Sequence, residues 1–246
     1  MASNSEEKSL NPAPIAEDWG VCDYRGAWDR QHDICNQLKE DPSAPERIVL
    51  VEHKPVYTLG FHGNAANLIA SEERLRSMGA ECIRIERGGD ITYHGPGQLV
   101  VYLFINLVKH GLGVKKYIEM LEESVRELCA SYGVETTSNN DAIGVWIDWE
   151  KPTARKICAI GVKVSHGVTM HGLALNVNTD LSAFSLINPC GFTDKGVTSL
   201  QKELGREVSM AEVKGRLLKV LASRLSKWQT SSIYSTPEFQ TGGARF

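Results

Sequence analysis

Three short segments of the chain combine residue types that could perform chemistry. The first reads Arg87-Gly-Gly-Asp-Ile-Thr-Tyr-His94 and continues into Gly-Pro-Gly-Gln98. Its glycines would let the backbone approach a bound molecule closely, and its arginine and histidine would place polar groups beside that molecule. Apolar residues lie on both sides of the segment, so we expect a loop between two strands that forms the floor of a pocket.

The second segment contains a lysine in apolar surroundings, in the sequence Arg155-Lys156-Ile-Cys-Ala-Ile-Gly161. Lysine is rarely buried without a partner, and the residues alone favour a position at the strand's edge where the ammonium reaches solvent. A glycine-interrupted strand follows at Met170-His171-Gly172, where a ligand could approach the backbone. The spacing leaves open whether His171 binds a ligand or is an ordinary buried histidine.

The third segment places a cysteine between proline and glycine, in Asn188-Pro-Cys190-Gly191. These neighbours favour a rigid turn and an exposed thiol. The other five cysteines lie on or beside expected helices and strands, where cysteine usually acts as a small hydrophobic residue. The residues alone leave the function of Cys190 open. The sequence contains no cysteine and histidine residues at a spacing typical of a metal site, so we expect no metal.

Regular elements must position these segments, and hydrophobic periodicity indicates where they lie. The expected helices and helical turns span residues 24–40, 71–78, 114–132, 181–187, 198–204 and 210–227. The expected strands span residues 47–52, 81–86, 99–106, 142–148, 156–164 and 168–177. Because the two kinds of element do not alternate regularly, we expect an α+β fold with a mixed β-sheet and flanking helices.

Length and composition bound the function further. The 246 residues suit one large domain or two small ones, and we expect a single domain over 16–228, between a disordered tail at 1–15 and a flexible tail at 229–246. A net charge of −3 gives no basic excess, so nucleic acid is not an expected partner. We find neither a signal peptide nor an apolar run long enough to span a membrane. We therefore expect a cytoplasmic protein with free thiols. A monomer is the expected state, although no residue pattern determines it.

The motifs R-G-G-x-x-T-Y-H-G-P-G-Q, R-K-I-x-x-I-G, H-G-L-A and N-P-C-G together resemble those of the lipoyl(octanoyl) transferases. The similarity runs from about Asp23 to past Thr198. It implies a fold similar to the catalytic domain of biotin and lipoate protein ligases, and a catalytic dyad of Cys190 and Lys156. The substrate-binding residues that it implies are Arg87, Gly88, Gly89, Asp90, Ile91, Thr92, Tyr93, His94, Ala159, Ile160, Gly161, Gly172, Leu173 and Ala174.

The resemblance also implies a reaction and its partners. Enzymes of this family move an octanoyl group from octanoyl-acyl carrier protein to a lysine of lipoate-dependent proteins, the first step of endogenous lipoate synthesis. The expected acceptors are the lipoyl domains of 2-oxoacid dehydrogenase complexes and the glycine cleavage H protein. Cys190 would carry the acyl group as a thioester, and the Lys156 ammonium would favour its thiolate and shuttle protons. No cofactor is required.

Three alternatives remain. An ATP-dependent lipoate or biotin protein ligase would share the fold, but lipoate ligases typically carry H-D-x-G-N where this chain reads His94-Gly-Pro-Gly-Gln98, and the G-R-G-R motif of biotin ligases is absent. The Lys156 segment and the loop at His94 argue against an amidotransferase that moves lipoyl groups between carrier proteins. A non-catalytic acyl-carrier-binding module is disfavoured because both Lys156 and Cys190 are present.

Overall fold

The computed structural model describes residues 12–188 and 195–231, with side chains as far as Trp228. In this part of the chain, eight strands form one mixed sheet. The strands follow the order β1 (Ile15–Cys22), β2 (Arg47–His53), β6 (Gln98–Phe104), β10 (Val168–Asn176), β9 (Arg155–Ser165), β8 (Val145–Ile147) and β7 (Thr137–Ser138), with β11 (Gly196–Val197) also paired to β9. The β1–β2 and β9–β11 pairs are parallel and the others antiparallel, which confirms the expected mixed sheet.

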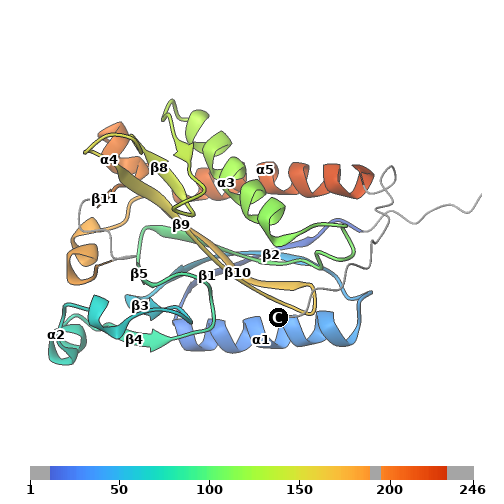
Figure 1. Ribbon diagram of the computed structural model, residues 1–246, viewed down its shortest axis with the longest axis horizontal. Helices are drawn as coiled ribbons and strands as arrows, with labels where there is room; N and C mark the ends of the chain where they lie inside the picture. Colours follow the sequence, from blue (N-terminus) through green and yellow to red (C-terminus); the bar gives the residue numbers. More distant parts are fainter. Residues whose placement is uncertain (1–11, 189–194, 232–246) are drawn as a thin grey trace, which may run out of the picture.

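Helices cover both faces of the main sheet (Figure 1). On one face lie α3 (Val114–Ala130) and α5 (Met210–Ser231), and on the other α1 (Tyr24–Glu40). The periodicity that predicted these helices is the apolar face that each one buries. In α3, for example, Leu121, Val125 and Leu128 are buried against the sheet, and their spacing of three and four residues places them on one side of the helix.

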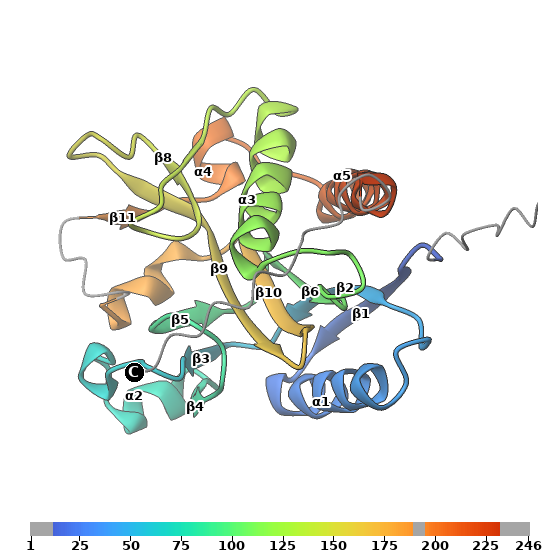
Figure 2. The same cartoon turned by 45° about the vertical axis from the view of Figure 1, so that its right-hand side comes forward.

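A smaller sheet stands beside the first, with the order β4 (Glu81–Arg84), β3 (Val56–Leu59) and β5 (Ile91–His94). Figure 2 shows it next to α2 (Glu72–Ser77), and α1 also contacts it, since Arg25 forms an ion pair with Glu81 of β4 at 2.7 Å. Short helical turns occur at η1 (Ala65–Asn67) and η2 (Leu181–Leu186), and α4 (Leu200–Leu204) follows β11. Among the described residues, no helix is both long and apolar enough to cross a membrane.

Several boundaries differ from those expected. Ile15, the last residue of the expected disordered tail, is the first residue of β1, which pairs with β2 along the edge of the main sheet. The mixed polar and apolar residues of β1 gave no clear period, and cross-strand pairing determines its conformation. The end of the expected loop at 87–94 is itself a strand, β5, and α5 continues to Ser231, past its expected end at 227.

Gly172 lies where two strands of the main sheet approach closely, and a side chain there should be destabilising. A Cβ atom at Gly172 would lie 2.2 Å from the backbone oxygen of Val101 in β6. We expect Gly172→Ala to lower the free energy of unfolding by about 2 kcal/mol or more, measured by urea denaturation, because the backbone must move to relieve the clash. Gly215→Ala is the control: a Cβ there meets open space in α5, and alanine should stabilise the helix by up to about 1 kcal/mol. Equal stabilities of the two variants would contradict this account.

Candidate active site

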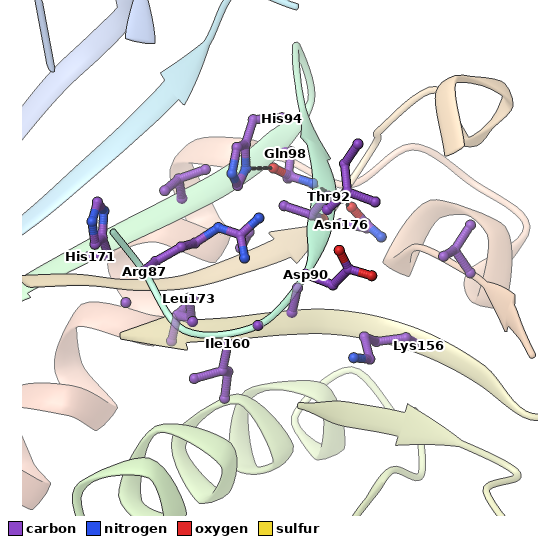
Figure 3. Close-up of a pocket in the computed structure, with 18 of the residues that line it drawn as sticks. Arg87, Asp90, Thr92, His94, Gln98, Lys156, Ile160, His171, Leu173 and Asn176 are labelled. Carbon is purple, nitrogen blue, oxygen red and sulfur yellow. Dashed lines mark hydrogen bonds between the residues drawn. The ribbon is translucent and has the colours of Figure 1, made fainter. Parts of the chain in front are cut away.

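One pocket brings together two of the three segments that the sequence singled out, the one that begins at Arg87 and the one that contains Lys156 (Figure 3). The loop at 87–90 and β5 form one side of it, and strands β6, β9 and β10 of the main sheet form another. All of the expected substrate-binding residues line the pocket except Gly88 and Tyr93. The expected residues that line the pocket are Arg87, Gly89, Asp90, Ile91, Thr92, His94, Ala159, Ile160, Gly161, Gly172, Leu173 and Ala174.

The two exceptions support the pocket from behind. The backbone N–H of Gly88 donates to the carbonyl of Val162 in β9, at 3.0 Å, and so attaches the loop to the main sheet. The ring of Tyr93 packs against Tyr57 and Phe184, with ring centroids 5.1 and 5.7 Å away. Tyr93, one of the expected substrate-binding residues, therefore belongs to the core behind the pocket.

Glycines in this region mainly allow backbone segments of the protein to pack together. A Cβ at Gly60 would lie 2.1 Å from the backbone oxygen of Gly89, and one at Gly161 would lie 2.8 Å from that of Gly88. The loop at 87–90 can therefore lie directly on the end of β3 and on β9 only because Gly60 and Gly161 have no side chain. The glycines fix the shape of the pocket floor through contacts within the protein.

A β-bulge directs Lys156 into the pocket. Val145 of β8 pairs with Cys158, but the next residue, Trp146, pairs with Lys156, so Ile157 is an extra residue in β9. Ile157 and Cys158 are both buried in the core on the far side of the sheet, and a regular strand would place Lys156 on the same face as Cys158. The bulge reverses the alternation, and the half-buried Lys156 lines the pocket instead.

The ammonium of Lys156 is held by a carbonyl and an aromatic ring. Its Nζ donates to the backbone oxygen of Ile143 at 3.1 Å and lies 4.5 Å from the ring centroid of Trp146. A second lysine, Lys195, lies 4.2 Å from the ring of Trp149, which itself contacts Trp146 at 4.9 Å between centroids. Both lysines line the pocket, and the attraction of a cation to an aromatic face favours these positions.

Cys190 lies outside the described residues. The residues on either side of its segment are described, and both sides are close to the pocket. The backbone N–H of Asn188 donates to the carbonyl of Asn67 at 2.8 Å, and Phe184, shortly before it, lines the pocket. After the segment, Lys195, Gly196 and Val197 line the pocket, and Val197 pairs with Lys156 in the β11–β9 ladder.

A chain of hydrogen bonds runs along the polar wall of the pocket. The guanidinium of Arg87 donates to the hydroxyl of Thr58 at 2.9 Å, and that hydroxyl lies 3.3 Å from Nε2 of His94. His94 Nδ1 lies 2.7 Å from Oε1 of Gln98, whose Nε2 donates to the Asn176 side chain at 2.9 Å. Because the Gln98 amide nitrogen is the donor to Asn176, its oxygen accepts, and the His94 proton is therefore assigned to Nδ1.

This arrangement makes His94 a neutral positioning group. Burial, together with the nearby His53 and Arg87, lowers the pKa of His94 to about 3, and burial likewise lowers the pKa of His53 to about 4. Nε2 of His53 contacts the hydroxyl of Tyr102 at 2.6 Å. Arg87 and His94 were expected to lie beside a bound molecule. In the structure both also stabilise the pocket wall through hydrogen bonds within the protein.

The buried histidines predict how stability depends on pH. An unfolded histidine has a pKa of about 6.5, so between about pH 6.5 and 4 the unfolded chain binds more protons than the folded one. The free energy of unfolding should therefore fall as the pH falls through this range, by up to about 1.4 kcal/mol per pH unit for each such histidine. Urea denaturation at pH 7 and pH 5 measures this slope. His94→Gln should reduce it and the exposed His166→Asn should not; identical slopes in all three proteins would refute the assignment.

Sequence reasoning missed several lining residues. Gln98, Val100 and Tyr102 alternate along β6 on the face that lines the pocket, and this strand was expected to be buried without a functional face. A period of two starting at Gln98 is the signal that could have identified them. The other lining residues not expected are Tyr24, Trp146, His171, Asn176, Phe184, Lys195, Gly196 and Val197.

The pocket suits an apolar chain that has a reactive end. Val100, Ala159 and Ala174 contribute apolar surface, and a lysine lies at one end. Within the described residues, no group of three or more histidine, cysteine, aspartate or glutamate side chains could hold a metal ion.

Comparison with known proteins gives a consistent result. A family model described as the lipoyl protein ligase A/B catalytic domain matches residues 23–222. An octanoyltransferase of Bacteroides fragilis strain YCH46 is 55% identical over 87% of this chain and 99% of its own length. An octanoyltransferase of Bacteroides thetaiotaomicron is 54% identical over 82% of this chain and 91% of its own.

Solved structures with the same fold are more distant in sequence. The bipartite lipoate protein ligase of Thermoplasma acidophilum superposes with a TM-score of 0.63 at 14% identity, over 87% of this chain and 91% of that one. A lipoate-protein ligase A bound with ATP gives a TM-score of 0.61 at 15% identity, over 93% of this chain and 98% of that one. At these identities the likeness establishes the fold, and it confirms the expected similarity to lipoate protein ligase catalytic domains.

Proposed function

This chain belongs to the lipoyl protein ligase A/B catalytic domain family as one of its octanoyltransferases, and we propose that it carries an octanoyl group as a thioester on Cys190. The donor is octanoyl-acyl carrier protein, and the acceptor is a lysine of a lipoate-dependent protein. The lipoyl domains of 2-oxoacid dehydrogenase complexes and the glycine cleavage H protein are the acceptors that the family resemblance implies.

The chemistry requires a thiol and a group that carries protons. The donor is already a thioester, so transfer to the Cys190 thiolate exchanges one thioester for another, and the released carrier thiolate takes its proton from the Lys156 ammonium, which leaves Lys156 neutral for the second step. Attack by the acceptor amine then forms an amide, and the Cys190 thiolate leaves. The Lys156 ammonium favours the thiolate in the first step by charge attraction, and neutral Lys156 takes the proton from the amine in the second. Neither step uses ATP or a metal.

One observation carries the proposal: the β-bulge that turns Lys156 away from the core and into an apolar pocket. In this position the Lys156 ammonium can act on the reactive end of an acyl chain bound in the pocket. The described residues before and after the Cys190 segment, Phe184 and Lys195, line the same pocket. This supports Cys190 as the partner of Lys156.

The test is acyl-enzyme formation without ATP. The purified protein is incubated with octanoyl-acyl carrier protein alone, and its intact mass is measured before and after hydroxylamine treatment. We expect a gain of one octanoyl group that hydroxylamine removes, because hydroxylamine cleaves thioesters. Activity that requires ATP would indicate a ligase instead. Binding of the carrier protein without an adduct or product would indicate a non-catalytic binding module.

A further inference from the structure

His171 combines two unfavourable features at one position of the pocket wall. Its backbone φ is +62°, in the left-handed region, although it lies within strand β10. Its side chain is 2% exposed, and both ring nitrogens are shielded from solvent and lack a hydrogen-bond partner among the described residues. Unpaired buried polar groups and left-handed backbone both cost stability, and such outliers concentrate at functional sites.

The left-handed backbone explains why this residue is a histidine. Glycine, asparagine, aspartate and histidine adopt this conformation more readily than other residues, and histidine is the largest of the four. A bulky side chain at this position is therefore most easily supplied by histidine. Because its nitrogens are shielded, the ring contributes volume to the pocket wall and does not offer a hydrogen bond to a ligand.

His171 and Lys156 lie at opposite ends of the pocket (Figure 3). Between them, small residues pair across β9 and β10: Ala159 with Ala174, and Gly161 with Gly172. His171 pairs with Val162, so the small-residue section ends at its ring.

The length of this section matches the proposed substrate. Ala159 pairs with Ala174, and Val162, three residues further along β9, pairs with His171. Three residues of a strand span roughly 10 Å at about 3.3 Å per residue. An extended eight-carbon chain has seven C–C bonds of about 1.5 Å and spans roughly 9 Å. A chain whose carbonyl carbon lies level with Ala159, and which lies over Ala174 and Gly172 of β10, would therefore reach the His171 level at about its eighth carbon.

We propose that His171 is the end wall of the acyl pocket and limits the transferred chain to about eight carbons. This inference rests on the proposed function, and it assigns a specificity-determining residue to it. A longer chain would have to displace a ring that the backbone conformation and the neighbouring Tyr102 ring, 6.4 Å away between centroids, hold in place.

The experiment shortens the side chain without disturbing the backbone. His171→Gly and His171→Asn both tolerate the left-handed conformation and remove bulk. For each protein, kcat/KM is measured with octanoyl-, decanoyl- and dodecanoyl-acyl carrier protein. We expect the dodecanoyl-to-octanoyl ratio to rise by about tenfold or more in His171→Gly, since a few methylenes in an apolar pocket discriminate by at least this factor. The rise in His171→Asn should be smaller.

A second left-handed histidine provides the matched control. His166, with φ +51°, lies exposed in the turn between β9 and β10, so His166→Gly makes the same substitution outside the pocket. Its chain-length ratio should equal that of the wild type. If the ratio also stays unchanged in His171→Gly and His171→Asn, the end-wall assignment is wrong. It is equally wrong if both variants remain folded by circular dichroism yet transfer no chain, because His171 would then serve the reaction itself. A wild-type protein that transfers no octanoyl group would instead refute the proposed function.

Discussion

Cys190→Ala should abolish the octanoyl adduct and lower octanoyl transfer by about 10³-fold or more, because removal of a covalent nucleophile eliminates the two-step route. The other cysteines are poor substitutes for it. Burial raises the pKa of the Cys35 thiol to about 11 and that of Cys129 to about 12. It also raises the pKa of Cys22, Cys82 and Cys158, so these five thiols remain protonated at neutral pH.

Intact mass after incubation with octanoyl-acyl carrier protein measures the adduct, and transfer to a purified lipoyl domain measures the activity. Cys22→Ala is a suitable control because Cys22 is one of the less buried thiols among the described cysteines. It should form the adduct like the wild type. An adduct that persists in Cys190→Ala, or disappears in Cys22→Ala, would move the nucleophile to another residue.

Lys156→Met should lower kcat for octanoyl transfer by about 10²- to 10⁴-fold, the range typical of general acid–base groups. Methionine retains much of the side-chain volume but removes the charge and the proton. Loss of the ammonium also raises the pKa of a neighbouring thiol, so the pH at which iodoacetamide modifies Cys190 should shift upward. The alkylation rate, measured from pH 5 to pH 10 by mass spectrometry, reports this shift.

Lys156→Arg separates the two functions of the lysine. Arginine keeps a positive charge but does not release its proton at accessible pH. The alkylation profile should therefore stay close to that of the wild type, while transfer to the acceptor remains slow. Lys195→Met removes the other lysine that lines the pocket and should affect both measurements less. If Lys156→Met leaves the alkylation profile unchanged, Lys156 does not favour the thiolate.

The sequence predicted the mixed sheet, the long helices and about half of the pocket lining, because each depends on a local pattern or a complete motif. Periodicity located α1, α3 and α5, whose buried faces are continuous. The loop from Arg87 to His94 was recognisable as a unit. These features require no knowledge of which distant segments pair with one another.

The remaining features depend on pairing across the sheet. The orientation of Lys156 follows from one extra residue opposite Trp146, and strict alternation along β9 would have directed the lysine to the opposite face. His171 could not be recognised as a pocket wall because its left-handed backbone is visible only in the structure. That Cys190 lies close to Lys156 stays a prediction, because Cys190 lies outside the described residues.

The hydrogen-bond chain from Arg87 through Thr58, His94 and Gln98 to Asn176 points in one direction, from a permanent cation towards a backbone carbonyl, since the Asn176 amide donates to Thr198. Each side chain accepts from the one before it and donates to the next. A change at one link leaves its neighbour with an unmatched donor or acceptor. Replacement of one of these residues alone should therefore cost stability even where the reaction never touches it.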